Sequence, residues 1–168
     1  MSEQDAGSRP SRDAAPADAA RVDPARAANG LADRLARVGR EIGGRESAHA
    51  SGLAQADQVA RTLHASVATA LDSFHSAASE TGAPHLRVEL AAPRPDDKHL
   101  RSVQFELSRG RHRAIVTVKS KGEVTLVGPF RTGKPEGPCK SFPVAADTEI
   151  ESALGGFLEE FLEEAATP

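Results

Sequence analysis

The sequence predicts an α+β fold in which helices pack on one face of an antiparallel sheet. Apolar residues recur at helical spacing before residue 80, and they alternate with polar residues between 86 and 126. After residue 147 they return to helical spacing. Helices that flank a run of alternating strands are typical of this class, and both are expected to cover the same sheet face.

Residues 1–28 are predicted to be a disordered tail. This stretch holds nine Ala, three Pro and scattered charges, with no periodic apolar residues. Such a composition buries too little apolar surface to offset the entropy lost on ordering.

Residues 29–80 are predicted to be helical, with a break near 43–44. Leu31, Leu35, Val38 and Ile42 are spaced four, three and four residues apart, which places them on one helical face. Gly43 and Gly44 follow, and two glycines cost a helix about 2 kcal/mol relative to Ala.

The second part of this segment, about 46–79, shows a heptad pattern with two interpretations. One is a helix that packs closely on its own sheet, because Ala occupies half of the seam positions. The other is a helix that pairs with a second chain. On that interpretation the partner interface contains Leu53, Ala60, Leu63 and Val67.

The length of the helical segment favours pairing with a second copy. A helix over 46–79 would measure roughly 50 Å, whereas strands of seven residues span about 23 Å. The excess apolar length predicts a homodimer.

Residues 81–168 are predicted to contain the sheet and a C-terminal helix, forming one domain with the preceding helix. Gly82 and Pro84 end that helix. Four strands of an antiparallel meander are expected, and the pattern is compatible with a fifth short strand. Their expected positions are 86–90, 103–107, 114–118, 124–126 and, for the fifth, 140–142.

The C-terminal helix has the clearest pattern in the chain. Thr148 and Glu151 fit a capping box at its start. Its exposed side is expected to carry several glutamates. The apolar stripe predicted to face the core consists of Ile150, Leu154, Phe157, Leu158, Phe161 and Leu162.

The net charge of −3 is unevenly distributed. Residues 85–141 carry twelve basic and six acidic side chains, a net +6, whereas residues 142–168 carry seven acidic and no Lys or Arg, a net −7. Either the two regions neutralise one another across the fold, or the basic region faces an anionic partner. The single Cys139 and the lack of a signal-like start predict a cytoplasmic protein, and no apolar run predicts a membrane contact.

The stretch "GPFRTGK", residues 128–134, matches seven of the eight positions of a phosphate-binding loop. Pro135 replaces the residue whose hydroxyl would hold magnesium, and further prolines and glycines prevent the helix that such a loop needs. The stretch is therefore predicted to be an extended connection and no nucleotide site.

Basic residues in two places predict an anion-binding or nucleic-acid-binding function as an alternative. The hairpin "SRGRHRA", 108–114, and the loop 128–143 carry them. A sequence pI of about 6.1 and the scarcity of aromatic residues count against a dedicated nucleic-acid domain. The candidate residues are Arg109, Arg111, Arg113, Arg131, Lys134 and Lys140.

No sequence motif predicts catalysis, a cofactor or a metal site. Cys139 has no local signature of a nucleophile, and the six histidines show neither an H-x-x-x-H pair nor a C-x-x-C partner. The sequence therefore predicts a non-catalytic protein-interaction module of the adaptor or chaperone-like kind, with a protein partner or a second copy of itself.

Overall fold

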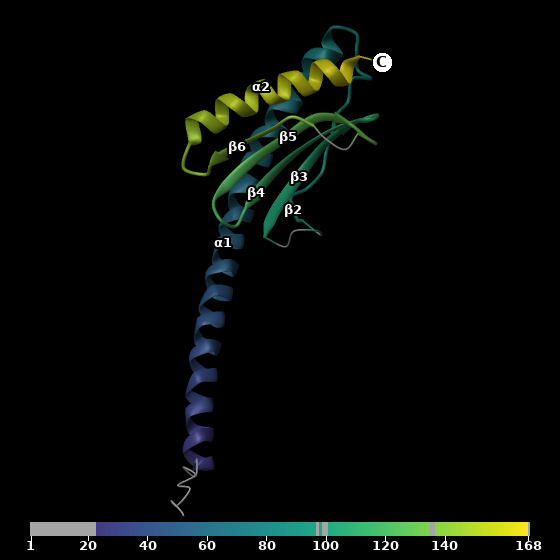
Figure 1. Cartoon of the computed structure of the whole chain (residues 1–168). Coiled ribbons are helices and arrows are strands. Elements are labelled where there is room, and N and C mark those ends of the chain that lie inside the picture. The colour runs from purple at the N-terminus through teal and green to yellow at the C-terminus, as the bar shows by residue number, and fades with distance from the viewer. Residues whose placement is uncertain (1–22, 97, 99–100, 135–136, 168) are drawn as a thin grey trace, which may run out of the picture. The chain divides into compact units, whose positions relative to one another are not determined.

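The computed structural model describes residues 23–96, 98, 101–134 and 137–167. The predicted disorder of residues 1–22 concerns positions outside this part. The chain forms two compact units, one ending at Arg40 and one beginning at Glu41. The second unit contains the whole sheet and its core (Figure 1).

Helix α1 spans Pro24–Glu80. Asp23 caps it, since its carboxylate accepts the backbone N–H of Ala25 at 3.0 Å, and Pro24 takes the first helical position, where no N–H is needed. Residues 24–28 are therefore helical, which corrects the predicted tail. The predicted break is also absent, because Gly43 and Gly44 lie within the helix.

The end of α1 was predicted correctly at Gly82. This residue has a φ of 85°, and two backbone bonds close the turn around it. Gly82 N–H donates to Ser79 O at 3.1 Å, and Ala83 N–H donates to Ala78 O at 2.8 Å. These two bonds form a Schellman motif, which requires the positive φ that glycine adopts without strain.

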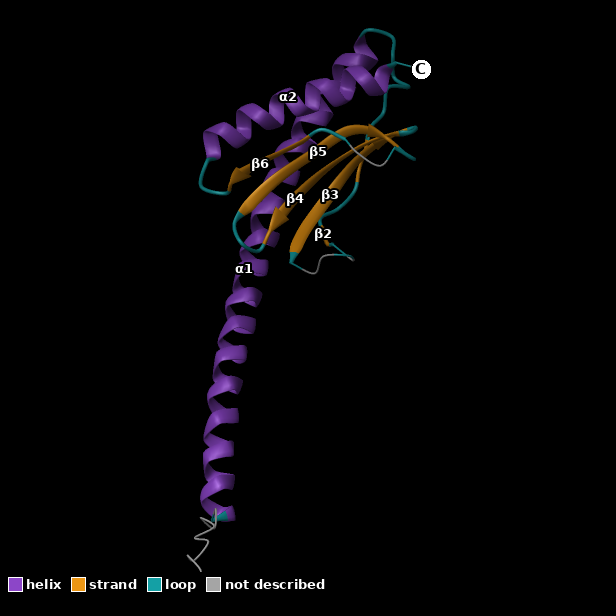
Figure 2. Ribbon diagram, viewed as in Figure 1, coloured by secondary structure: helices purple, strands orange, loops and turns teal. Residues whose placement is uncertain are grey.

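The sheet is antiparallel throughout, as predicted. Strands β3, β4 and β5 form the meander, and β6 extends it where a fifth strand was compatible with the pattern (Figure 2). The first predicted strand is reduced to β1, which pairs with β3 beside β2. The bounds are β1 Glu89–Leu90, β2 Arg94–Pro95, β3 Ser102–Arg109, β4 His112–Lys119, β5 Glu123–Arg131 and β6 Cys139–Pro143.

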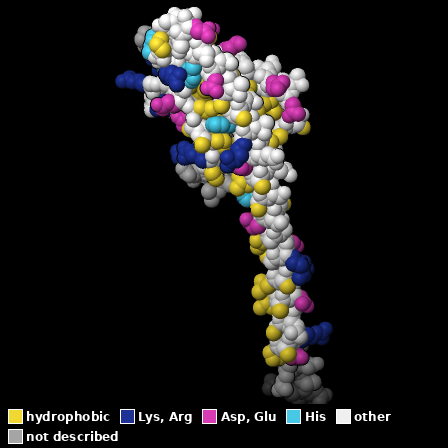
Figure 3. Space-filling view, turned by 180° about the vertical axis from the view of Figure 1, so that it is seen from behind, with side chains coloured by type: hydrophobic (Ala, Val, Ile, Leu, Met, Phe, Trp, Pro, Cys, Tyr) yellow, Lys and Arg dark blue, Asp and Glu magenta, His cyan; other side chains and the backbone are white. Residues whose placement is uncertain are grey.

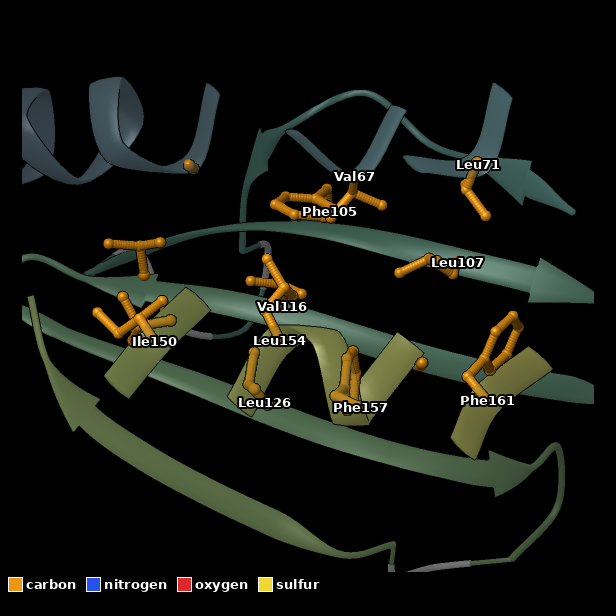
Figure 4. Close-up of a cluster of buried hydrophobic side chains, with 14 of the residues drawn as sticks. Val67, Leu71, Phe105, Leu107, Val116, Leu126, Ile150, Leu154, Phe157 and Phe161 are labelled. Atoms are coloured by element: carbon orange, nitrogen blue, oxygen red, sulfur yellow. The ribbon is translucent and has the colours of Figure 1, made fainter. Parts of the chain in front are cut away.

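One face of this sheet is buried under both helices of the second unit. The strand register brings Phe105 opposite Val116, and Val116 opposite Leu126, so these side chains share a face. Val67 of α1 and Leu154 of helix α2 (Asp147–Ala166) pack into the same core (Figure 4). The prediction that both helices cover the same sheet face is confirmed.

Helix α2 buries the stripe that its sequence predicted. Ile150, Leu154, Phe157 and Phe161 are buried, and Leu158 and Leu162 are half-buried against the core. The predicted capping box does not form, since Ala146 is the N-cap and no side chain caps the helix.

The opposite sheet face carries cross-strand ion pairs. Arg113 Nε lies 3.0 Å from Glu106 Oε1, and Lys119 Nζ lies 2.5 Å from Glu123 Oε1. The hydrogen bond from Lys119, with the positive charge of that side chain, lowers the pKa of Glu123 below its ordinary value.

Candidate functional site

Four large apolar side chains of α1 are exposed. Among the described residues with large hydrophobic side chains, these stand out with exposed fractions of 56% for Leu31, 61% for Leu35, 43% for Val38 and 47% for Ile42. We call them the α1 stripe. Yellow side chains mark this part of the helix in Figure 3.

The partner interface predicted from the heptad pattern lies elsewhere on α1. Ala60 and Val67 are fully buried in the core of their own chain, and Leu53 and Leu63 are half-buried against it. Small side chains such as Ala56 and Ala60 let the helix approach the strands closely. Of the two interpretations of this pattern, packing on the chain's own sheet is the one that the structure shows.

An apolar groove separates α1 from α2 on the buried side of the sheet. It has a volume of about 720 Å³, and its lining includes Val59, Leu63, Ile150 and Leu158. Because Val59, Leu63 and Leu158 are only half-buried, the groove is a second apolar surface, distinct from the α1 stripe.

Four of the six predicted anion-binding residues line one pocket at the end of the sheet. Arg109, Arg111, Arg131 and Lys134 contribute to a hollow of about 600 Å³. The register explains how they meet, because Arg109 of β3 stands opposite His112 of β4, which in turn stands opposite Arg131 of β5. We call this hollow the basic pocket.

Hydrogen bonds fix the walls of the basic pocket. The guanidinium of Arg109 donates to the backbone carbonyl of Ala165 in the last turn of α2. Thr132 donates to the carbonyl of Arg111 from its backbone N–H at 2.8 Å and from its hydroxyl at 3.2 Å. The β3–β4 turn is thereby tied to the segment after β5.

The other two predicted residues lie outside the basic pocket. Arg113 bonds Glu106 on the opposite sheet face and does not line the basic pocket. Lys140 of β6 lines a separate hollow with Glu160 of α2.

The near-match to a phosphate-binding loop adopts another structure. Residues 128–131 belong to β5, residues 132 and 133 form a turn, and the next element is β6. A loop of that class directs its backbone N–H groups at phosphates from a helix N-terminus, and this segment has a strand at the corresponding place.

Within the described ranges, no group of three or more His, Cys, Asp or Glu side chains is placed to hold a metal ion. Cys139 is a free, exposed cysteine on β6. The helices in this same part of the chain are all too short or too polar to cross a bilayer. Comparison with known proteins finds no matching family model, curated protein or solved structure.

Proposed function

We propose that this protein is a non-catalytic interaction module that self-associates through the α1 stripe. The observation that carries the proposal is the exposure of four large apolar side chains at coiled-coil spacing in one helix. Exposed apolar residues that stand singly need no explanation, but a continuous stripe of them indicates a surface that another helix covers.

The residues beside the stripe favour an antiparallel pair. With Leu35 and Ile42 at heptad position a, the g positions are Arg34 and Glu41. In an antiparallel pair g positions face g positions across the seam. Arg34 of each copy then meets Glu41 of the other, which gives two ion pairs related by the dimer axis.

The other flank of the stripe permits close approach in the same arrangement. Its e positions are Ala32 and Gly39, which carry the smallest side chains. Arg45 takes the next d position after Val38, so a charged side chain ends the apolar seam. The apolar seam is therefore short, and it ends at Arg45.

A parallel pair has the opposite electrostatics. There each g position faces the e position five residues later in the other copy. Arg34 would meet Gly39, and Glu41 would meet Glu46 with like charge. Like charges at these positions oppose pairing, so orientation is specified by charge.

Two further parts of the proposal rest on the sequence. No motif for nucleophilic, metal or phosphate-loop chemistry occurs, so the role proposed is binding without turnover. The single cysteine suits a reducing compartment, and we infer a cytoplasmic location.

Charge reversal tests the pairing and its orientation. Glu41→Arg should weaken the dimer about 5- to 30-fold, since two attractive contacts become repulsive and together change the dissociation free energy by about 1–2 kcal/mol. Arg34→Glu combined with Glu41→Arg should restore it. Sedimentation equilibrium of the full chain measures the dissociation constant.

Asp33→Arg makes the matched control, because position f faces away from the seam. It should leave the dissociation constant unchanged. A tighter dimer with Glu41→Arg alone would indicate the parallel arrangement, and equal effects of Glu41→Arg and Asp33→Arg would exclude a specific seam.

A further inference from the structure

The basic pocket carries positive charges that no acidic side chain in its described lining balances. Arg109 has a structural role, because a cation at the C-terminal end of α2 satisfies a backbone carbonyl and interacts favourably with the helix dipole. Arg111, Arg131 and Lys134 are exposed and form no ion pair within the described part of the chain. The described lining of the pocket contains no acidic side chain.

The strand register forces this concentration of charge. Neighbouring strands lie about 4.8 Å apart, so Arg109 and Arg131 flank the buried His112 at roughly twice that spacing. Two positive charges at this separation raise the electrostatic potential at this end of the sheet. An anion bound there would be attracted by both.

We propose that the basic pocket binds a compact anion carrying one or two phosphoryl groups, with Arg111, Arg131 and Lys134 as its ligands. The two guanidinium groups match phosphoryl oxygens by paired N–H donors, and the lysine adds a third positive charge. The bond from Thr132 to Arg111 holds the two loops at a fixed separation, which reduces the ordering cost of binding.

The shape of the site favours a small anion over a nucleic-acid strand. The cations converge on one hollow of about 600 Å³, whereas a strand needs a row of charges along a groove. The one ring in the described lining belongs to His112, which is buried, so bases would find no exposed ring on which to stack.

Titration calorimetry with inorganic pyrophosphate tests the site on the full chain at about 0.15 M ionic strength. The unmodified protein should bind one equivalent per chain. Arg131→Gln should weaken binding about ten-fold or more, because a charge-assisted hydrogen bond is lost. Arg111→Gln should act similarly, and thermal unfolding should confirm that both variants remain folded.

Arg113→Gln is the matched control, since it removes the same charge from the same hairpin on the opposite sheet face. It should leave pyrophosphate binding unchanged. Equal losses from Arg113→Gln and Arg131→Gln would overturn the proposal, as would no binding at millimolar pyrophosphate. Tighter binding of a short single-stranded DNA than of pyrophosphate would overturn it in favour of a nucleic-acid surface. Leu35→Asp should bind pyrophosphate normally, which separates this site from the α1 stripe.

Discussion

Gly52 marks a close approach between α1 and the sheet. A Cβ at this position would collide with the backbone carbonyl oxygen of Ser120 in the turn between β4 and β5. That turn cannot move freely, because Ser120 N–H donates to Arg101 O at 2.7 Å. Glycine is therefore required at position 52 for space, although it lowers helix propensity there.

The requirement at Gly52 predicts opposite effects of one substitution at two helical glycines. Gly52→Ala should destabilise the second unit by about 1–3 kcal/mol, because the added methyl group forces the helix away from the turn. Gly43→Ala meets nothing within 4 Å and should instead increase helicity, as alanine is favoured by about 1 kcal/mol. Thermal unfolding followed by circular dichroism measures both. A melting temperature that rises for Gly52→Ala would contradict the close contact.

At the scale of elements, helix α1 shows which glycines end a helix. Gly43 and Gly44 were expected to interrupt it, yet neither has a positive φ, and the helix continues through both. Gly82 does end it, because a left-handed residue there lets two backbone bonds close the final turn. Glycines within a helix lower its stability without ending it, whereas the backbone bonds of a Schellman motif end the helix.

Helix α2 is predicted to contribute mainly through its buried face. Phe161→Ala should cost about 3–5 kcal/mol of unfolding free energy, since this ring is fully buried beside the sheet. Leu162→Ala on the same helix should cost less than half as much, because that side chain is only half-buried. Urea unfolding with a linear extrapolation gives both values. A loss below about 1 kcal/mol of unfolding free energy for Phe161→Ala would contradict the place of α2 in the core.

The sequence predicted strands and core well because their signal is local. Alternation placed Phe105, Val116 and Leu126 on one face, and the register confirms it. The basic pocket depends on contacts between distant residues. A register shift between Arg113 and Ile115 brings His112 opposite Arg131, and nothing in the spacing of the hairpin indicates such a shift. The sequence therefore predicted the basic residues of the pocket but not which of them lie together.

Across the whole molecule, charge is divided between a basic sheet region, 85–141, and an acidic C-terminal region, 142–168. Among the described residues, no ion pair joins the glutamates of α2 to the basic region of the sheet. The ion pairs of the sheet lie within the basic region itself, as with Arg113 and Glu106. Direct ion pairs among the described residues therefore do not neutralise the two regions, and no carboxylate of α2 pairs with the cations of the basic pocket.

The central claim is self-association through the α1 stripe, and light scattering coupled to size exclusion tests it most directly. At micromolar concentration the full chain should show twice its 17.6 kDa mass. Leu35→Asp should return it to 17.6 kDa, because a carboxylate in an apolar seam is strongly disfavoured, whereas Ala36→Asp outside the seam should leave the dimer intact. A mass of 17.6 kDa for the unmodified chain across that range, or a dimer unaffected by Leu35→Asp, would contradict the claim.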